Sequence, residues 1–283
     1  MNTLLPPTDP RSAFQPTDNS GLIWGYAFNG EAPAEPLTEQ EATERLNAPQ
    51  DPAAFIWLHF NLAHAHCLRW LQQHTAIDEQ FYEALSEGLT STRIERLDNS
   101  LLAVMNDIDF DFNFESDDIH TLWIHASPTL VITARTHPLR SVDTLRQHIR
   151  RGDVPLTSTQ LLERLLRAQA DVLVLIVRDV TRRIDTIEDN LLTGRAQMHP
   201  RRLGTLRRLL VRLKRLLAPE PSAMFRLLQT PPLWMSDTDL QALRGASEEF
   251  SVFLRDMQSL EERIKLLQEE IAASINEDTN RSI

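Results

Sequence analysis

The sequence of 283 residues is short of two things that would decide its class at once, cysteine and long apolar runs. Its single cysteine, Cys67, cannot form an internal disulfide, which is typical of a reducing compartment. The longest strongly apolar run, residues 172–177, is far shorter than the roughly 20 residues that span a bilayer. Residues 1–19 are proline-rich and polar, not basic and then apolar, so we expect no secretory signal peptide.

The sequence also lacks the local signatures of common enzymes. It has no phosphate-binding P-loop, no His-Glu-x-x-His and no Gly-x-Ser-x-Gly, so we predict that it is not an enzyme. The alternative left open is a metal hydrolase site assembled in space from the nine histidines and the carboxylates. The formal net charge of −11 argues against indiscriminate nucleic-acid binding, so we expect no nucleic-acid partner.

The first half of the chain predicts an α+β fold. Residues 1–20 are expected to be a loose tail, and residues 21–157 a mixed α/β sheet domain with helices on its faces. A Thr-x-x-Glu capping box, Thr38 and Glu41, predicts the start of its first helix. The strands are expected at residues 22–28, 54–60, 93–97, 101–112, 120–126 and 129–135, and the helices at residues 38–46, 62–74, 78–88 and 141–150.

The second half predicts only helices. Residues 158–236 are expected to form a helical hairpin with a basic second helix, and residues 237–283 a stalk helix without proline. At about 1.5 Å per residue, the stalk would be roughly 60–70 Å long. Its apolar side chains recur every seven residues in two columns, which predicts a coiled-coil type seam. The columns are Leu243, Phe250, Met257, Ile264 and Ile271, and Ala246, Phe253, Leu260, Leu267 and Ser274.

A polar column lies on another face of the stalk. Glu262, Glu269 and Asn276 follow at sevenfold spacing, with Asn280 one turn further on. If the seam packs against the stalk's own subunit, these oxygens would face a partner or an axis. A solvated surface is the other interpretation of the same pattern.

Charge is segregated between the helices of this half. The stalk is acidic, whereas the helix at residues 200–217 is rich in arginine. One interpretation is that the two helices pack side by side and offset each other's charge. The other is that the arginine face lies near anionic lipid or forms a movable element near a charged pathway.

Two groups of residues are candidate metal ligands. His64 and Cys67 would share one face of a helix at i and i+3, and imidazole and thiolate suit zinc. Asp107, Asp109 and Asp111 alternate with apolar residues, so on a strand their carboxylates would share one face. The alternative for the first group is a set of surface histidines at the start of a helix. The alternative for the second group is the solvent-exposed side of a half-buried strand.

The order of these elements resembles the cytoplasmic part of the CorA superfamily of divalent-cation transporters. The arginine-rich hairpin and the phrase Ile-Ala-Ala-Ser-Ile-Asn-Glu-Asp-Thr-Asn-Arg at residues 271–281 look most like its zinc-transporting ZntB branch. Residues 55–59, Phe-Ile-Trp-Leu-His, resemble the family's early strand, although His59 stands where magnesium-type members often have an acidic residue. The family's Gly-Met-Asn signature and both membrane helices are missing from the sequence.

The resemblance implies a funnel-shaped homopentamer that conducts a divalent cation, expected to be Zn²⁺, through the inner membrane of a bacterium. This portion would face the cytoplasm, gate or regulate ion passage, and continue after residue 283 into the first membrane helix. Matching the Thr-Asn phrase to the family places Asn280 toward the pore, and helical spacing then adds Asn276, Glu269 and Glu262. The alternative function is a soluble coiled-coil regulator or scaffold whose seam binds another helix.

Overall fold

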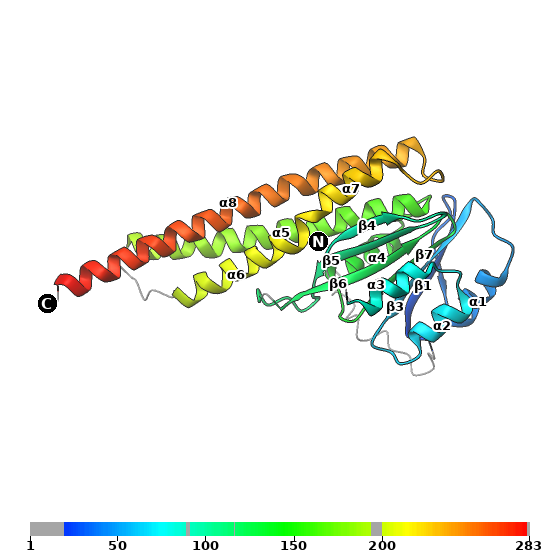
Figure 1. Ribbon diagram of the computed structural model, residues 1–283, viewed down its shortest axis with the longest axis horizontal. Coiled ribbons are helices and arrows are strands. Elements are labelled where there is room, and N and C mark those ends of the chain that lie inside the picture. Colours follow the sequence, from blue (N-terminus) through cyan, green and yellow to red (C-terminus); the bar gives the residue numbers. More distant parts are fainter. Residues whose placement is uncertain (1–19, 89–90, 116, 194–199, 282–283) are drawn as a thin grey trace, which may run out of the picture.

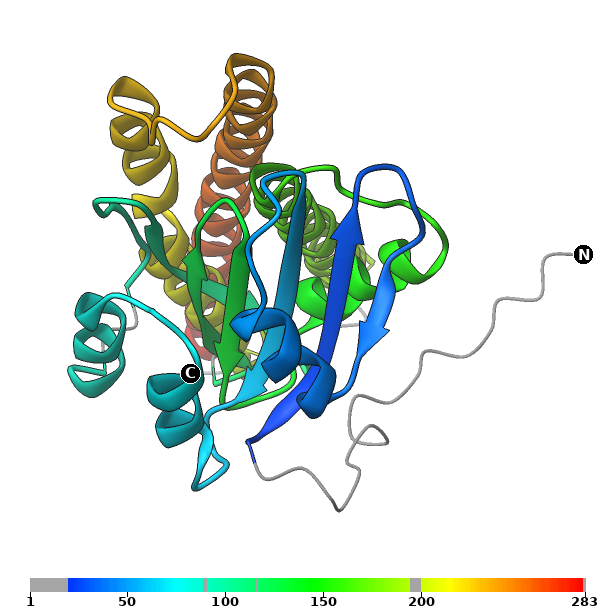
Figure 2. The ribbon, with the colours of Figure 1, turned by 90° about the vertical axis from the view of Figure 1, so that its right-hand side faces the viewer.

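The computed structural model describes residues 20–88, 91–115, 117–193 and 200–281. A sheet with short helices lies at one end of the molecule, and long helices extend from it to the C-terminal end (Figure 1). The fold is α+β, as predicted, and Figure 2 views it along the long helices with the sheet in front. The sheet strands are β1 Leu22–Asn29, β2 Glu35–Leu37, β3 Ala54–Asn61, β4 Arg93–Arg96, β5 Leu101–Ile108, β6 Ile119–Ala126 and β7 Leu130–Arg135.

The seven strands form one mixed sheet in the order β2-β1-β3-β7-β6-β5-β4. Every neighbouring pair is antiparallel except β3 and β7, which run parallel with Leu58 opposite Ile132. Two antiparallel groups therefore meet at a single parallel pair in the middle of the sheet.

Helices cover both faces of this sheet, which explains why β3 is a continuous apolar block and not an alternating one. Leu58 and Phe60 face one core with the first three helices, whereas Phe55 and Trp57 face the other core with α4, α5 and α7. The capping box at Thr38 forms as predicted, since Thr38 N donates to Glu41 Oε2 at 2.7 Å. The short helices are α1 Glu39–Asn47, α2 Cys67–His74, α3 Glu79–Ser86 and α4 Arg140–Arg150.

Four further helices make the elongated half. The longest, α8, has 45 residues and is therefore about 68 Å long. Within the described residues, no helix is both long enough and apolar enough to cross a membrane. The helices are α5 Ser158–Leu192, α6 Pro200–Leu217, α7 Pro219–Gln229 and α8 Asp237–Arg281.

The predicted seam of α8 is confirmed for nine of its ten positions. From Leu243 to Ile271 its members are buried, and only Ser274 is exposed. The seam packs against α5, α6 and α7 of the same chain, so its apolar surface is already covered without a second subunit. One hydrophobic core contains residues of the sheet and of the first turns of α5, so packing is continuous across residue 157. The predicted division of the chain into domains stays a prediction.

Several predicted boundaries were wrong. Strand β5 ends at Ile108 and not at residue 112, and α2 begins at Cys67 and not at residue 62. The short edge strand β2 was not predicted, because its three residues include a proline. The predicted tail lies outside the described residues, apart from Ser20.

Candidate cation-facing surface of the stalk helix

The polar column of α8 lies on the side of the helix that its own chain leaves open. Glu262, Glu269, Asn276 and Asn280 are all exposed. At about 100° per residue, they lie roughly 160° around the helix from the buried seam. Glu262, Glu269 and Asn276 are about 10.5 Å apart along the helix axis, since seven residues separate each from the next. The column is thus a row of oxygen-bearing side chains facing away from the subunit.

Few neighbours neutralise the two carboxylates of this column. Lys265 Nζ is 4.0 Å from Glu269 Oε1, one turn away on the same helix, and both side chains are largely exposed. A pair of this kind contributes little, because water screens it and both side chains lose rotamer freedom. Among the described residues Glu262 forms no ion pair. Both carboxylates therefore remain able to attract a cation.

Arg263, next to Glu262, fixes the rotation of α8 about its own axis. Its guanidinium donates to both carboxylate oxygens of Glu188 and, at 2.6 Å, to Asp185 Oδ1, both on α5. The carboxylates of Glu188 and Asp185 raise the pKa of Arg263. A planar guanidinium held on two oxygens by two donors defines direction as well as distance. The polar column consequently keeps its outward orientation.

The predicted pairing of α6 with α8 is confirmed as packing, but the charges meet differently from the expectation. Only Lys214 and Glu261, 3.5 Å apart, form an ion pair between these helices in the described part of the chain. Arg207 Nη1 donates to the amide oxygen of Gln268 at 3.2 Å. Arg263 of α8 pairs instead with Asp185 and Glu188 of α5, so at this contact the base is on the stalk and the acids are on the hairpin.

The premise for a zinc site at His64 and Cys67 was wrong. His64 lies in the turn before α2, so the two residues do not share a helical face. Its Nδ1 accepts from the backbone N–H of His66 at 3.3 Å. Cys67 is 0% exposed and packs in the core beneath the sheet. A metal ion could reach the histidine, whereas the thiol is an apolar core group.

The three aspartates do not share a strand face either. Asp107 is the only one inside β5, and it is buried, where it accepts hydrogen bonds from the hydroxyl and backbone N–H of Ser141 on α4. Asp109 Oδ2 is 3.3 Å from His120 Nε2, and Asp111 is exposed in the turn that follows. Because β5 ends at Ile108, the twofold alternation that would align the carboxylates stops there.

The described residues contain no group of three or more His, Cys, Asp or Glu side chains arranged to hold a metal ion. The described part of the chain therefore adds no support for a metal role of His64, Cys67, Asp107, Asp109 or Asp111, and these roles stay predictions.

His59, which departs from the magnesium-type pattern, is a core residue. Its ring stacks on Trp24 with 4.2 Å between ring centroids, and its Nδ1 is 2.7 Å from Thr133 Oγ1. Burial, followed by the charges of Arg135 and Arg146, lowers the pKa of His59 well below its usual value. The histidine is consequently neutral and fixed at the centre of the sheet.

A buried polar cluster was not foreseen. Glu220 of α7 is 3% exposed and accepts from Gln169 Nε2 of α5 at 3.3 Å, and the same amide nitrogen donates to the carbonyl of Asn106 at 2.7 Å. Burial, with a further contribution from the charge of Asp107, raises the pKa of Glu220 to about 8. Burial also raises the pKa of Asp107 to about 6. In the sequence Glu220 is only an acid that follows a proline in the first turn of a helix. This pattern is too common to predict a buried carboxyl group.

The family described as CorA-like Mg²⁺ transporter protein matches residues 52–283 of this chain. The chain belongs to the CorA family. Membership places it among divalent-cation transporters and outside the known enzyme families. The resemblance inferred from the stalk and the hairpin is therefore confirmed.

Individual CorA-family relatives align over nearly the whole chain. The divalent cation transporter CmaX of Pseudomonas aeruginosa is 25% identical over 273 residues, which cover 96% of this chain and 81% of CmaX. The structure of full-length CmaX matches with a TM-score of 0.84 over 95% of this chain and 82% of CmaX, at 25% identity. The zinc transport protein ZntB of Pectobacterium carotovorum subsp. carotovorum is 24% identical over 264 residues, 93% of this chain and 78% of that protein.

The fold of a further CorA-family protein agrees. The ZntB cytoplasmic domain from Vibrio parahaemolyticus matches with a TM-score of 0.74 and 16% identity, and the match covers 91% of this chain and 99% of that domain. At this identity the agreement concerns the fold alone. It shows that sheet and long helices occur together in a CorA-family protein.

Proposed function

We propose that this chain forms the cytoplasmic funnel of a CorA-type transporter in the bacterial inner membrane, that its cation is Zn²⁺, and that the funnel gates or regulates ion passage. The observation that carries the proposal is the outward row of oxygens on α8. Its seam is covered by its own chain, and its opposite face presents two carboxylates and two amides. Zinc is supported by the relatives named ZntB.

In the proposed homopentamer, the column of each subunit faces a common axis. Rings of carboxylate and amide oxygen then concentrate cations, and no single ring coordinates an ion fully. An ion that is attracted but not trapped can move on toward the membrane. Native mass spectrometry of the membrane-extracted transporter tests the assembly, and a monomer or dimer would contradict it.

The runner-up, a coiled-coil regulator, requires a free seam on α8 for a partner helix. The seam residues from Leu243 to Ile271 are buried against α5, α6 and α7, so that surface is occupied. This observation favours the funnel over the regulator.

Removing the two stalk carboxylates is the test of the axial surface. Glu262→Gln combined with Glu269→Gln is expected to lower the initial rate of Zn²⁺ uptake roughly tenfold at low ionic strength, because the potential that steers cations is weakened. The loss should shrink as salt is added, since screening removes the same potential in the unmodified protein. Uptake into vesicles, followed with a zinc-sensitive dye, measures the rate.

A matched control separates position from total charge. Glu270 and Glu277 are also exposed on α8, but they lie about 75–95° around the helix from the polar column. Glu270→Gln with Glu277→Gln removes the same charge and should leave uptake close to that of the unmodified protein. Equal losses in the two pairs, or no loss in the first pair, would argue against an axial column.

A further inference from the structure

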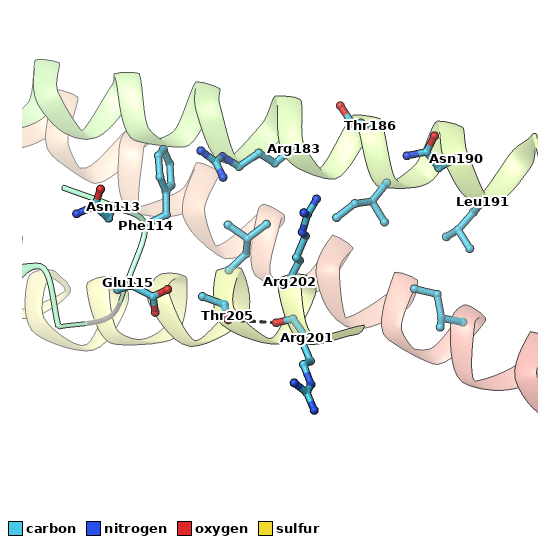
Figure 3. Close-up of a pocket in the computed structure, with 13 residues that line it drawn as sticks. Asn113, Phe114, Glu115, Arg183, Thr186, Asn190, Leu191, Arg201, Arg202 and Thr205 are labelled. Carbon is cyan, nitrogen blue, oxygen red and sulfur yellow. Dashed lines mark hydrogen bonds between the residues drawn. The ribbon is translucent and has the colours of Figure 1, made fainter. Parts of the chain in front are cut away.

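A cavity of about 580 Å³ lies between the helices of the elongated half, apart from the polar column of α8. Its walls come from α5, α6, α8 and the loop that joins β5 to β6 (Figure 3). Sites for small molecules in proteins commonly have volumes of about 300–1,000 Å³. The cavity therefore has the size of a small-molecule site, and nothing in the transport proposal uses it.

Positive charge gathers at this cavity in a protein whose net charge is −11. Arg183 of α5 and Arg202 of α6 extend into the space between the helices, whereas Arg201 points away from it (Figure 3). In the described part of the chain none of these three forms an ion pair, while the nearby Arg182 and Arg212 each have an aspartate partner. Among the described lining residues, Glu115 is the one carboxylate. Two guanidinium groups are thus available to a ligand.

The loop holds one of these guanidinium groups in place at a conformational cost. Phe114 has φ 65°, in the left-handed region that side chains other than glycine rarely adopt. The carboxylate of Asp118 accepts from the backbone N–H of Asn113 at 2.7 Å and of Glu115 at 3.1 Å, which stabilises the turn. The guanidinium carbon of Arg183 then lies over the Phe114 ring, 3.8 Å from the ring centroid. Strained backbone that orients a side chain is frequent where proteins bind ligands.

The rest of the wall combines amide and hydroxyl groups with an apolar surface. Ile187 and Leu191 of α5, Leu206 of α6 and Ile271 of α8 line it beside Phe114. A bare inorganic anion would leave this surface unused, and a purely apolar molecule would leave the guanidinium groups unused.

We propose that this cavity binds a small organic anion with a phosphate or carboxylate group beside an apolar body. The anionic group would accept hydrogen bonds from Arg183 and Arg202, which suit flat oxyanions, and the apolar body would rest on Ile187, Leu191 and Ile271. Such a ligand joins the α5–α6 hairpin to the stalk helix, because its contacts come from all three helices. The inference stands independently of which cation is transported.

Calorimetric titration of the 283-residue chain tests the site, with phenyl phosphate as the probe. Phenyl phosphate should bind more tightly than inorganic phosphate, and phenol should not bind measurably. Arg183→Gln combined with Arg202→Gln should weaken binding of phenyl phosphate about 10- to 100-fold, as expected for the loss of charged hydrogen bonds. Vesicles containing phosphatidylglycerol form a second arm, which distinguishes a lipid headgroup from a soluble anion.

The control pair is Arg178→Gln with Arg215→Gln. These arginines are exposed, lie one on α5 and one on α6, and are outside the lining. The control should retain the affinity of the unmodified protein, and circular dichroism should show both double variants folded. The site is supported if the Arg183 and Arg202 variant alone loses binding of phenyl phosphate or of vesicles. Which of the two probes binds then shows whether the anion is a soluble molecule or a lipid headgroup. No binding of either, or equal weakening in both pairs, overturns it.

Discussion

Replacing Ile264 by alanine is expected to lower the free energy of unfolding by about 2–5 kcal/mol. Ile264 is 0% exposed and belongs to the core that α8 shares with α5 and α6. Its truncation removes apolar contacts and leaves a cavity, which the three long helices cannot easily close because they pack against one another. Urea unfolding followed by circular dichroism gives the difference.

Leu266 provides the matched control for this effect. It lies two residues further along the same helix and is 65% exposed. Leu266→Ala should change the free energy of unfolding by no more than about 0.5 kcal/mol, as is usual for surface positions. Similar losses at the two positions would mean that α8 is not packed by the predicted seam.

The buried Glu220 is expected to make stability fall as pH rises above neutral. Its pKa is about 8 in the folded protein, chiefly because burial disfavours the carboxylate, and about 4.3 when unfolded. Between these values the folded state holds a proton that the unfolded state has released, so folding is favoured at low pH and the advantage is lost by about pH 8. From pH 6.5 to 8.5 the loss is about 2 kcal/mol.

Glu220→Gln should flatten this pH dependence, because glutamine keeps the shape and does not ionise. The window above pH 6.5 is chosen because burial lowers the pKa values of His59 and His125, which affects stability mainly at lower pH. Denaturant titrations at pH 6.5 and 8.5 measure the slope. Glu87→Gln, at an exposed site, should keep the full fall. An unchanged slope in Glu220→Gln would show that another group causes it.

Periodicity in the sequence predicted the long elements well, because their burial follows a simple repeat. The predicted seam of α8 is buried from Leu243 to Ile271, and the apolar block predicted as a strand is β3. The seam follows the spacing that packing against one side imposes on a helix, whereas β3 is apolar throughout because helices cover both faces of the sheet. The exposed column from Glu262 onward follows from the same spacing, since it is the opposite face of that helix.

Features that depend on where an element ends were missed. The alternation of Asp107 with Asp109 and Asp111 looks strand-like, but the chain turns after Ile108, so the shared face never forms. His64 and Cys67 were separated in the same way, by a helix that begins only at Cys67. End points are set by tertiary contacts, such as that of Asp107 with Ser141, which spacing alone does not encode.

The arginine-lined cavity could not have been predicted from spacing at all. Phe114, Arg183, Arg202 and Ile271 come from four segments that are brought together only when the helices pack on the sheet. The arginine-rich composition of α6 was visible in the sequence, but which arginines have partners is a property of the folded chain. Glu220 was missed for the same reason.

The strand order also constrains the sequence of events during synthesis. Strand β7 emerges last of the seven, yet it lies at the centre of the sheet, between β3 and β6. The early strands β1 to β3 can form only an isolated sheet fragment until residue 135 has left the ribosome, and its β3 edge is then unpaired. Completing the sheet requires contacts between β3 and β7, which are about 75 residues apart in the sequence. Contacts between residues so far apart generally slow folding. A nascent chain paused before β7 should therefore associate through β3 with other chains or with a chaperone, whereas one extended through α4 should not.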